Sequence, residues 1–273
     1  GSNQKFAKEL SEMHKLVAKF LPCWAVTSLS AKGRIPFAPA IYDLLIIDEA
    51  SQCDIASILP LLYRANRVVI IGDNKQLPHI SSISKKQDIN LLQKYNVGYE
   101  WSYSANSVFD LANAVNSPSS LVSLLDHHRS FADIIEFSNN EFYEGKLRIA
   151  TDYGRLKLPP NEAAGIRWID VKGKVLKPTN GGAYNNFEIN RIIEELNRLV
   201  IKNDYQGTIG VVTPFRSQAD KIRDAIEKVP ALKNQLYTKN DFLVDTVHKF
   251  QGDEKDIIIF SSVISQDTPY GAI

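Results

Sequence analysis

The stretch from Asp43 to Gln52, DLLIIDEASQ, constrains the fold more than any other part of the chain. An unbroken aliphatic run of this kind is typical of a strand buried on both faces in a parallel sheet. The run ends in two adjacent carboxylates, Asp48 and Glu49. Two acids at a strand end can simply be solvated where the strand reaches the surface. Alternatively, they lie at the carboxyl edge of the sheet, where α/β proteins bind ligands.

The ligand-binding alternative has a specific chemistry. One carboxylate can hold Mg²⁺, a hard cation that prefers oxygen ligands, and its neighbour can orient or deprotonate a water that attacks a phosphate. A second strand-like run, RVVIIGD at 67–73, leads directly into the polar segment GDNKQLP at 72–78. This segment can be an ordinary turn, since Gly, Asp and Asn favour turns. On a neighbouring parallel strand, however, Gln76 would lie beside the two acids, within reach of a terminal phosphate or the attacking water.

Composition sets limits on these alternatives. The chain has 273 residues and 44% hydrophobic residues, which fits a globular protein of one large or two smaller domains. No apolar run approaches the ~18 residues of a membrane span, and no signal segment is recognisable, so we expect a cytoplasmic or nuclear location. The net charge of +1 neither favours nor excludes nucleic acid. The distant Cys23 and Cys53 lack CxxC spacing and are expected to be free thiols.

The order of predicted elements indicates an α/β fold. An amphipathic helix is expected at 4–20, followed by strands at 23–28, 43–48 and 67–73. NSPSS at 116–120 is a predicted linker. A second series of elements then begins. It comprises strands at 121–125, 165–171, 208–215, 242–248 and 256–263, and helices at 131–143 and 189–200. We therefore predict two α/β domains, residues 1–118 and 119–273.

Taken together, DEASQ and GDNKQLP resemble motifs II and III of superfamily 1 helicases, most closely the branch of RNA-surveillance and replication-associated helicases. Later segments resemble further motifs in family order: HHRSFADIIEFSNNEFYEGKL (127–147) motif IV, GVVTPFRSQ (210–218) the motif before motif V, and VDTVHKFQGDEKDIIIFSSV (244–263) motif V. The resemblance covers roughly residues 23 to 263. It implies two RecA-like parallel-sheet domains, the first incomplete, and ATP and Mg²⁺ as cofactors.

The resemblance also implies roles for individual nucleotide-site residues. Asp48 would hold Mg²⁺ through water, Glu49 would orient the hydrolytic water, and Gln76 would sense the γ-phosphate. Arg129 would reach the γ-phosphate from the second domain, because a planar guanidinium suits phosphate oxygens. The alternative for Arg129 is a surface residue near the start of a helix.

Further roles follow for the second domain and for nucleic acid. Glu254, after Gly252, would accept a hydrogen bond from the ribose, the alternative being a solvated acid in a charged turn. Contacts to the backbone of single-stranded DNA or RNA, of the kind that positions phosphates, are implied for Thr213, Thr246, His248 and Ser30. Ser30 is included because CWAVTSLS at 23–30 resembles the segment before motif II.

The chain departs from the family pattern at several points. His79 stands where the family usually has a second Pro, and Asp253 where it often has Arg; we expect altered loop geometry or affinity from both. No GxxxxGK[ST] occurs in the sequence, and SQDTPYGAI ends before the place of motif VI. The P-loop supplies the cradle and Lys for the phosphates, and a transition-state arginine is worth roughly 10³–10⁵ in rate. We therefore expect this chain to be the core of a longer helicase and to hydrolyse little or no ATP alone.

Three functions are compatible with these motifs. In the first, the parent protein couples ATP hydrolysis to translocation along single-stranded DNA or RNA, and the branch resemblance implies 5′-to-3′ movement. In the second, a degenerate helicase-like module binds nucleic acid or a protein without turnover. In the third, the chain belongs to an ATPase subunit of a nuclease or restriction system. The intact Asp48, Glu49, Gln76 and Arg129 favour the first over the second.

Overall fold

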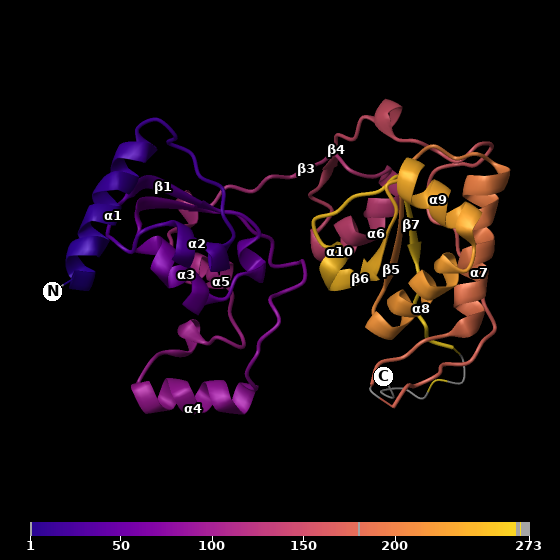
Figure 1. The fold of residues 1–273 in the computed structure, drawn as a ribbon. Helices are drawn as coiled ribbons and strands as arrows, with labels where there is room; N and C mark the ends of the chain where they lie inside the picture. The colour runs from indigo at the N-terminus through magenta and orange to yellow at the C-terminus, as the bar shows by residue number, and fades with distance from the viewer. Residues whose placement is uncertain (1, 180, 266–267, 269–273) are drawn as a thin grey trace. The chain divides into compact units, whose positions relative to one another are not determined.

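The computed structural model describes residues 2–179, 181–265 and 268. It divides into two compact units, residues 1–123 and 124–273, and each is described by itself (Figure 1). The predicted boundary near residue 118 falls shortly before this division, at a 3₁₀ turn formed by Pro118–Ser120. Among the described residues, no helix is both long enough and apolar enough to cross a membrane.

The first unit is built around two parallel strands and the helix that connects them. β1 pairs with β2, and Ile47 lies opposite Ile70 at the carboxyl end of the ladder. α3 begins after Asp54, whose carboxylate caps the helix by accepting from Ser57 N at 2.8 Å. The elements of this unit are α1 (Ser2–Ala18), α2 (Ser28–Arg34), β1 (Tyr42–Ile47), α3 (Ile55–Leu62), β2 (Ala65–Ile70), α4 (Lys85–Tyr95) and α5 (Val108–Val115).

A small apolar cluster fixes β1 against α3 and α5. Its buried members are Ile47, Ala50, Ile55, Ile58 and Val108. These side chains come from the end of β1, the turn after it and the first turns of the two helices. The turn that carries the predicted catalytic acids is therefore packed directly against the core of this unit.

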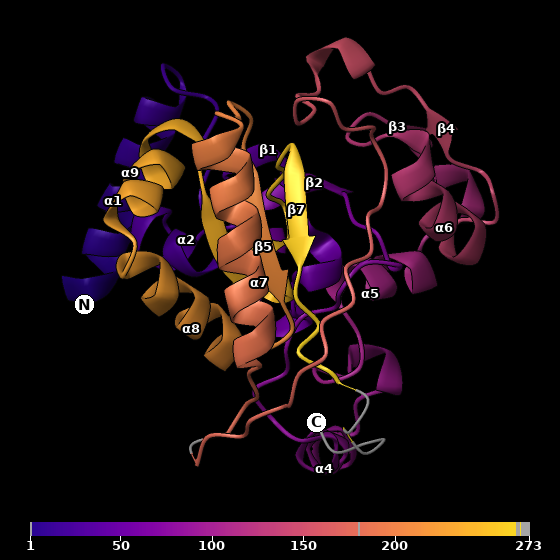
Figure 2. The same ribbon diagram turned by 90° about the vertical axis from the view of Figure 1, so that its right-hand side faces the viewer.

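The second unit contains a three-stranded parallel sheet and a separate parallel pair. The sheet has the order β6–β5–β7, and α7 crosses one of its faces (Figure 2). The strands of the second unit are β3 (Asp126–His127), β4 (Arg148–Ile149), β5 (Ile209–Thr213), β6 (Leu243–Thr246) and β7 (Ile257–Phe260). Its helices are α6 (Ala132–Phe142), α7 (Asn186–Leu196, continued by a π-helical segment over Asn197–Lys202), α8 (Arg216–Glu227), α9 (Pro230–Lys239) and α10 (Val247–Phe250).

Every residue of β5 is buried, and the strand forms the centre of this unit. Its aliphatic side chains pack with residues from α7, α8 and α9. Gly210 allows the ring of Phe250 to lie over the strand, because a Cβ at position 210 would lie 2.3 Å from that ring. Phe250 thereby anchors α10, and with it the loop that follows, to the middle of the sheet.

The aliphatic strand predictions at 43–48, 67–73, 208–215, 242–248 and 256–263 are confirmed as β1, β2, β5, β6 and β7, although the bounds differ and both β1 and β2 begin before the predicted start. The expectation that the strand at 43–48 is buried on both faces is wrong, because Leu44 and Ile46 of β1 are 47% and 60% exposed. The predicted strand at 23–28 is wrong. Thr27 is the N-cap of α2, and its Oγ1 accepts from Ser30 N. The hydroxyl residues that follow the apolar run therefore start a helix instead of continuing a strand.

The predicted strands at 121–125 and 165–171 are also wrong. Leu124 is 85% exposed and lies at the division between the units, where the described chain offers it no pairing strand. In the second segment Trp168 is 85% exposed, while Arg167 forms an ion pair with the buried Glu195 of α7. Side-chain contacts to a helix thus hold this segment, and no backbone ladder is formed by it.

The close approach at Gly210 generates a prediction for stability. Gly210→Ala should displace the Phe250 ring and lower the free energy of unfolding of the second unit by about 1–3 kcal/mol. Hydrogen exchange of the β5 amides in a urea series measures this unit by itself. Gly33→Ala, where an added Cβ meets nothing within 4 Å, is the control and should leave those amides unchanged. A loss below about 0.5 kcal/mol at position 210 would contradict the packing described.

Candidate functional site

The polar loops after β1 and β2 leave the sheet at the same edge. Ile71 N donates to Ile47 O at 2.8 Å, which extends the ladder one residue beyond β2. Ala50 N then donates to Ile71 O, also at 2.8 Å. The backbone of the turn that contains Asp48 and Glu49 is therefore bonded directly to the chain that leads into GDNKQLP.

Two further contacts hold these loops together. Asp73 N donates to the hydroxyl of the buried Ser51 at 3.4 Å. Gly72 lies so close that a Cβ on it would be 3.0 Å from Ser51 N and 2.8 Å from the ring of Phe109. A larger residue at position 72 would push the two loops apart, so this glycine is needed for a close approach and not for a turn.

The two predicted catalytic acids differ in their surroundings. Asp48 is exposed, and its Oδ1 accepts from Glu49 N at 2.9 Å. Glu49 is half-buried and adopts a left-handed backbone with φ 52° and ψ 40°, which is uncommon for any residue other than glycine. Its Oε2 accepts from Gln52 Nε2 at 3.1 Å. Gln52 was not singled out from the sequence, although it lies three residues along the same turn.

Gln76 is exposed, and the side chain of Asp73 contacts it. Gln76 Nε2 donates to Asp73 Oδ2 at 3.1 Å, while Asp73 Oδ1 accepts from Lys75 N at 2.9 Å. Asp73 thus shapes the loop that presents Gln76. Sequence reasoning named Gln76 only; the adjacent Gly-Asp pair was the signal that a turn-forming carboxylate would accompany it.

The chemistry of this edge fits a magnesium nucleotide. Mg²⁺ usually keeps several waters and binds one or two carboxylates together with substrate phosphates. Asp48 supplies one exposed carboxylate of the required kind. Among the residues that the structure describes, no group of three or more His, Cys, Asp or Glu side chains could form a cage for a metal.

His79 ties the end of the GDNKQLP loop to the segment around α4. Its Nε2 lies 2.7 Å from Tyr103 O. That segment is itself held by the buried Asp88 of α4, which accepts hydrogen bonds from Ser102 and Ser104. Burial raises the pKa of Asp88, but these hydrogen bonds outweigh burial and hold the pKa below its ordinary value. The residue at the family's Pro position thus has an anchoring contact of its own.

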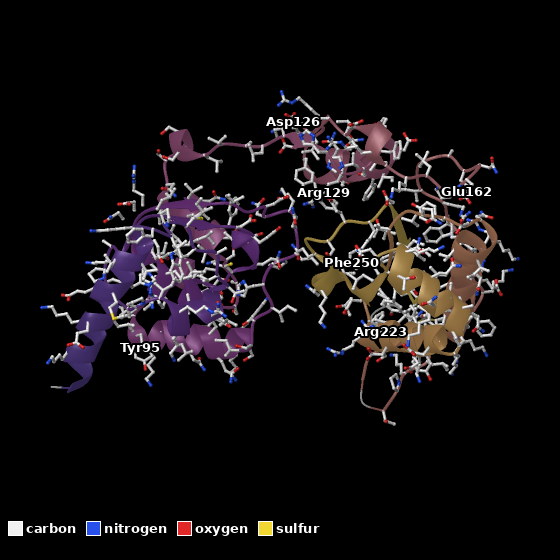
Figure 3. The ribbon with its side chains drawn as sticks, turned by 45° about the horizontal axis from the view of Figure 1, so that its top comes forward. Tyr95, Asp126, Arg129, Glu162, Arg223 and Phe250 are labelled. Carbon is white, nitrogen blue, oxygen red and sulfur yellow. The ribbon has the colours of Figure 1, made fainter. Side chains whose placement is uncertain are left out.

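In the second unit, Arg129 and Glu254 form an ion pair. Their Nε and Oε2 atoms lie 3.2 Å apart, and the side chains are 64% and 71% exposed (Figure 3 labels Arg129). The pair joins two residues predicted for the nucleotide site from motifs that are more than a hundred residues apart in the chain. Gly252 precedes Glu254 with φ +89° and open space around it, so it provides the left-handed turn of this loop.

His127 supports the turn that carries Arg129. Ser130 N donates to His127 Nε2 at 3.0 Å, which requires that nitrogen to be unprotonated. Burial lowers the pKa of His127, and the positive charges of Arg129 and His128 lower it further. The neutral imidazole is therefore part of the local structure.

The four residues predicted to contact nucleic acid lie in different environments. Thr213 has 0% exposure, and its hydroxyl accepts from Phe215 N at 3.4 Å. Thr246 is half-buried at the N-cap of α10, and His248 is exposed on that helix. In the first unit, the half-buried Ser30 donates to Thr27 O at 3.0 Å. His248 is thus the most accessible member of the set, and Thr213 the least accessible.

Comparisons with known proteins agree with the motifs and define the class. Family models described as AAA domain match residues 104–271 and residues 25–82. The resemblance to superfamily 1 helicases is confirmed. The chain belongs to the AAA domain family.

Several curated helicases are similar to the chain over most of its length. An uncharacterized ATP-dependent helicase of Mycoplasma genitalium is 30% identical over 258 residues, covering 90% of this chain and 22% of that protein. Helicase SEN1 of Saccharomyces cerevisiae is 28% identical, covering 97% of this chain and 12% of that protein. The DNA polymerase alpha-associated DNA helicase A of the same yeast is 28% identical, covering 83% of this chain and 34% of that protein. The chain thus spans about a third or less of each relative.

The surroundings of His127 generate a prediction for its titration. Its pKa, measured by NMR, should lie below 6.5, and Arg129→Gln should raise it while leaving it below 6.5, because burial is the larger cause. Because the pKa is lower in the folded state than in the unfolded state, neutral His127 contributes to the free energy of unfolding. This contribution is present above about pH 6.5 and is lost as pH falls through the folded pKa. Lys239→Gln, on α9, is the charge control and should leave the His127 pKa unchanged. A value of 6.5 or more in the unmodified chain would contradict the burial described.

Proposed function

We propose that the chain is the motif-bearing core of an ATP-dependent helicase with two RecA-like parallel-sheet domains. That helicase couples ATP hydrolysis to translocation along single-stranded DNA or RNA. The observation that carries this proposal is the bonded pair of loops after β1 and β2, which gathers Asp48, Glu49 and Gln76 at one sheet edge. Since the chain spans only part of its relatives, the activity proposed is that of the protein that carries it.

Each residue has a separate task in this proposal. Asp48 would hold Mg²⁺ through water, and the bound metal would neutralise charge on the phosphates. Glu49 orients the attacking water and receives its proton. Gln76 contacts the γ-phosphate or that water.

The second unit contributes charge and nucleic-acid contacts. Arg129 stabilises the negative charge that develops on the γ-phosphoryl group. Glu254 accepts from the ribose, and the left-handed turn at Gly252 sets the loop that presents it. Thr246 and His248 contact the phosphodiester backbone of the single strand, and such contacts position the strand without reading its sequence. Ser30 completes the proposed set, whereas the Thr213 side chain, predicted as a fourth contact, has no exposed surface to offer the strand in this structure.

Hydrolysis by the protein that carries this chain is the first test. We expect ATP turnover that is stimulated by single-stranded DNA, by single-stranded RNA, or by both. Glu49→Gln should lower it by about 10²–10⁴-fold, because the amide cannot accept the proton. The assay measures phosphate release with each polymer in turn, and Glu9→Gln on the exposed surface of α1 is the control. Absence of turnover together with retained nucleic-acid binding would favour the degenerate binding module instead.

The role of Arg129 gives a second test. Arg129→Gln should lower the hydrolysis rate by about 10³-fold or more while leaving nucleotide binding measurable, since the charge acts mainly in the transition state. Arg129→Lys should restore little, because an ammonium lacks the planar fork that matches phosphate oxygens. Arg148→Gln removes another exposed arginine of the same unit, one paired with Asp126 at 2.6 Å. Equal losses at positions 129 and 148 would show that general charge, and not Arg129 itself, matters.

A further inference from the structure

We propose that Gln52 is a positioning residue for Glu49: its side-chain amide holds one oxygen of the Glu49 carboxylate and directs the other toward the attacking water. The inference rests on the proposed function, because it assumes that Glu49 acts on that water. It gives Gln52 a role that neither the motifs nor the family comparison assigns to it. Three features of the turn at residues 49–53 carry it.

The first feature is the backbone of Glu49. Its φ of 52° lies in the left-handed region, where a side chain larger than glycine is disfavoured. Conformations of this kind persist only where the surrounding structure determines them, and they cluster at functional sites. The conformation turns the Glu49 side chain away from the direction that a regular strand would give it, so contacts must define where the carboxylate lies.

The second feature is the rigidity of the turn that carries Gln52. Ala50 and Ser51 are buried, and Ala50 N donates to Ile71 O on the neighbouring loop. Gln52 N donates to Glu49 O at 2.9 Å, and Cys53 N to Ala50 O at 3.2 Å. The position of the Gln52 backbone is therefore fixed relative to Glu49 and to the sheet edge.

The third feature is the side-chain contact itself. Gln52 Nε2 donates to Glu49 Oε2 at 3.1 Å, and Gln52 is itself half-buried. This contact fixes one oxygen of the carboxylate, and a neutral amide does not compete for the proton that Glu49 is proposed to take. Gln52 thereby orients the base.

A purely architectural role for Gln52 makes different predictions. If its side chain only closed the turn, substitution would lower the stability of the first unit and leave kcat and KM of the folded enzyme unchanged. The two roles are separated by variants that preserve size but change the donor. Gln52→Met removes the amide at nearly constant length, and Gln52→Glu replaces it with a second carboxylate.

The experiment measures kcat and KM for ATP at one pH, with saturating single-stranded nucleic acid, in the protein that carries this chain. Gln52→Met should lower kcat by about 10–100-fold and change KM by less than about threefold, since a misplaced catalytic group acts on the chemical step. Gln52→Glu keeps the size of the side chain but replaces the amide donor with a second acceptor, so it should lower kcat at least as far. Gln87→Glu, an exposed position in the first turn of α4, is the matched control and should move neither quantity.

The outcomes separate this inference from the function on which it rests. If Glu49→Gln retains full turnover, the proposed catalytic role of Glu49 fails and the inference fails with it. If Glu49→Gln is inactive while both Gln52 variants keep the unmodified kcat, the inference alone is overturned. A folded Gln52→Met variant, shown by an unchanged melting temperature and nucleic-acid affinity, with lowered kcat supports positioning. If Gln52→Met melts early, the kcat of a folded Gln52→Glu variant decides: a lowered kcat supports positioning, and an unmodified kcat overturns it.

Discussion

The parallel pairing of β1 with β2 is the constraint on which the candidate site of the first unit depends. The pairing continues past the strands through Ile71, whose amide and carbonyl bond to Ile47 and Ala50 on the other loop. Because the register is fixed there, the acids after one strand and the polar loop after the other must share an edge. The buried Ser51 and the close approach at Gly72 leave that arrangement little freedom. The arrangement of the edge thus follows from backbone pairing, and the Ser51 hydroxyl and the close approach at Gly72 reinforce it.

In the second unit, too, a loop with proposed functional residues is attached to the core, here through the packing of Phe250 on Gly210. β5 is buried on both faces, and the missing side chain at Gly210 admits the ring of Phe250. The anchored ring fixes the end of α10, and Asp253 N bonds back to Phe250 O at 3.0 Å. The loop that ends in Glu254 is therefore attached to the most buried strand of its unit. In both units, exposed functional side chains lie within a few residues of positions that packing holds firmly.

The sequence alone was informative where an aliphatic run coincides with a strand. β1, β2, β5, β6 and β7 are such runs, but of these five only β5 is buried at every residue, while β1, β2 and β7 keep exposed aliphatic side chains. The same signal was misleading at 165–171, because Arg167 binds Glu195 and an aliphatic alternation alone does not supply a pairing edge. Motif spacing located Asp48, Glu49 and Gln76. It assigned no role to Gln52 or Asp73, although both lie within the same motifs. Their contacts depend on the left-handed turn at Glu49 and on the geometry of one polar loop.

The Arg129–Glu254 ion pair is exposed and weak, so under the proposed function Arg129 can exchange Glu254 for a phosphate. Exposed pairs of this kind contribute only about 0.2–1 kcal/mol, because water and salt screen them. A phosphate offers the guanidinium more negative charge and two parallel acceptors, so it competes effectively for Arg129. Release of Glu254 would follow from the same exchange and would leave its carboxylate able to accept from a hydroxyl. The two proposed nucleotide contacts are therefore coupled, because both require the Arg129–Glu254 ion pair to break. Since that ion pair is weak, its exchange for contacts to the nucleotide is favourable.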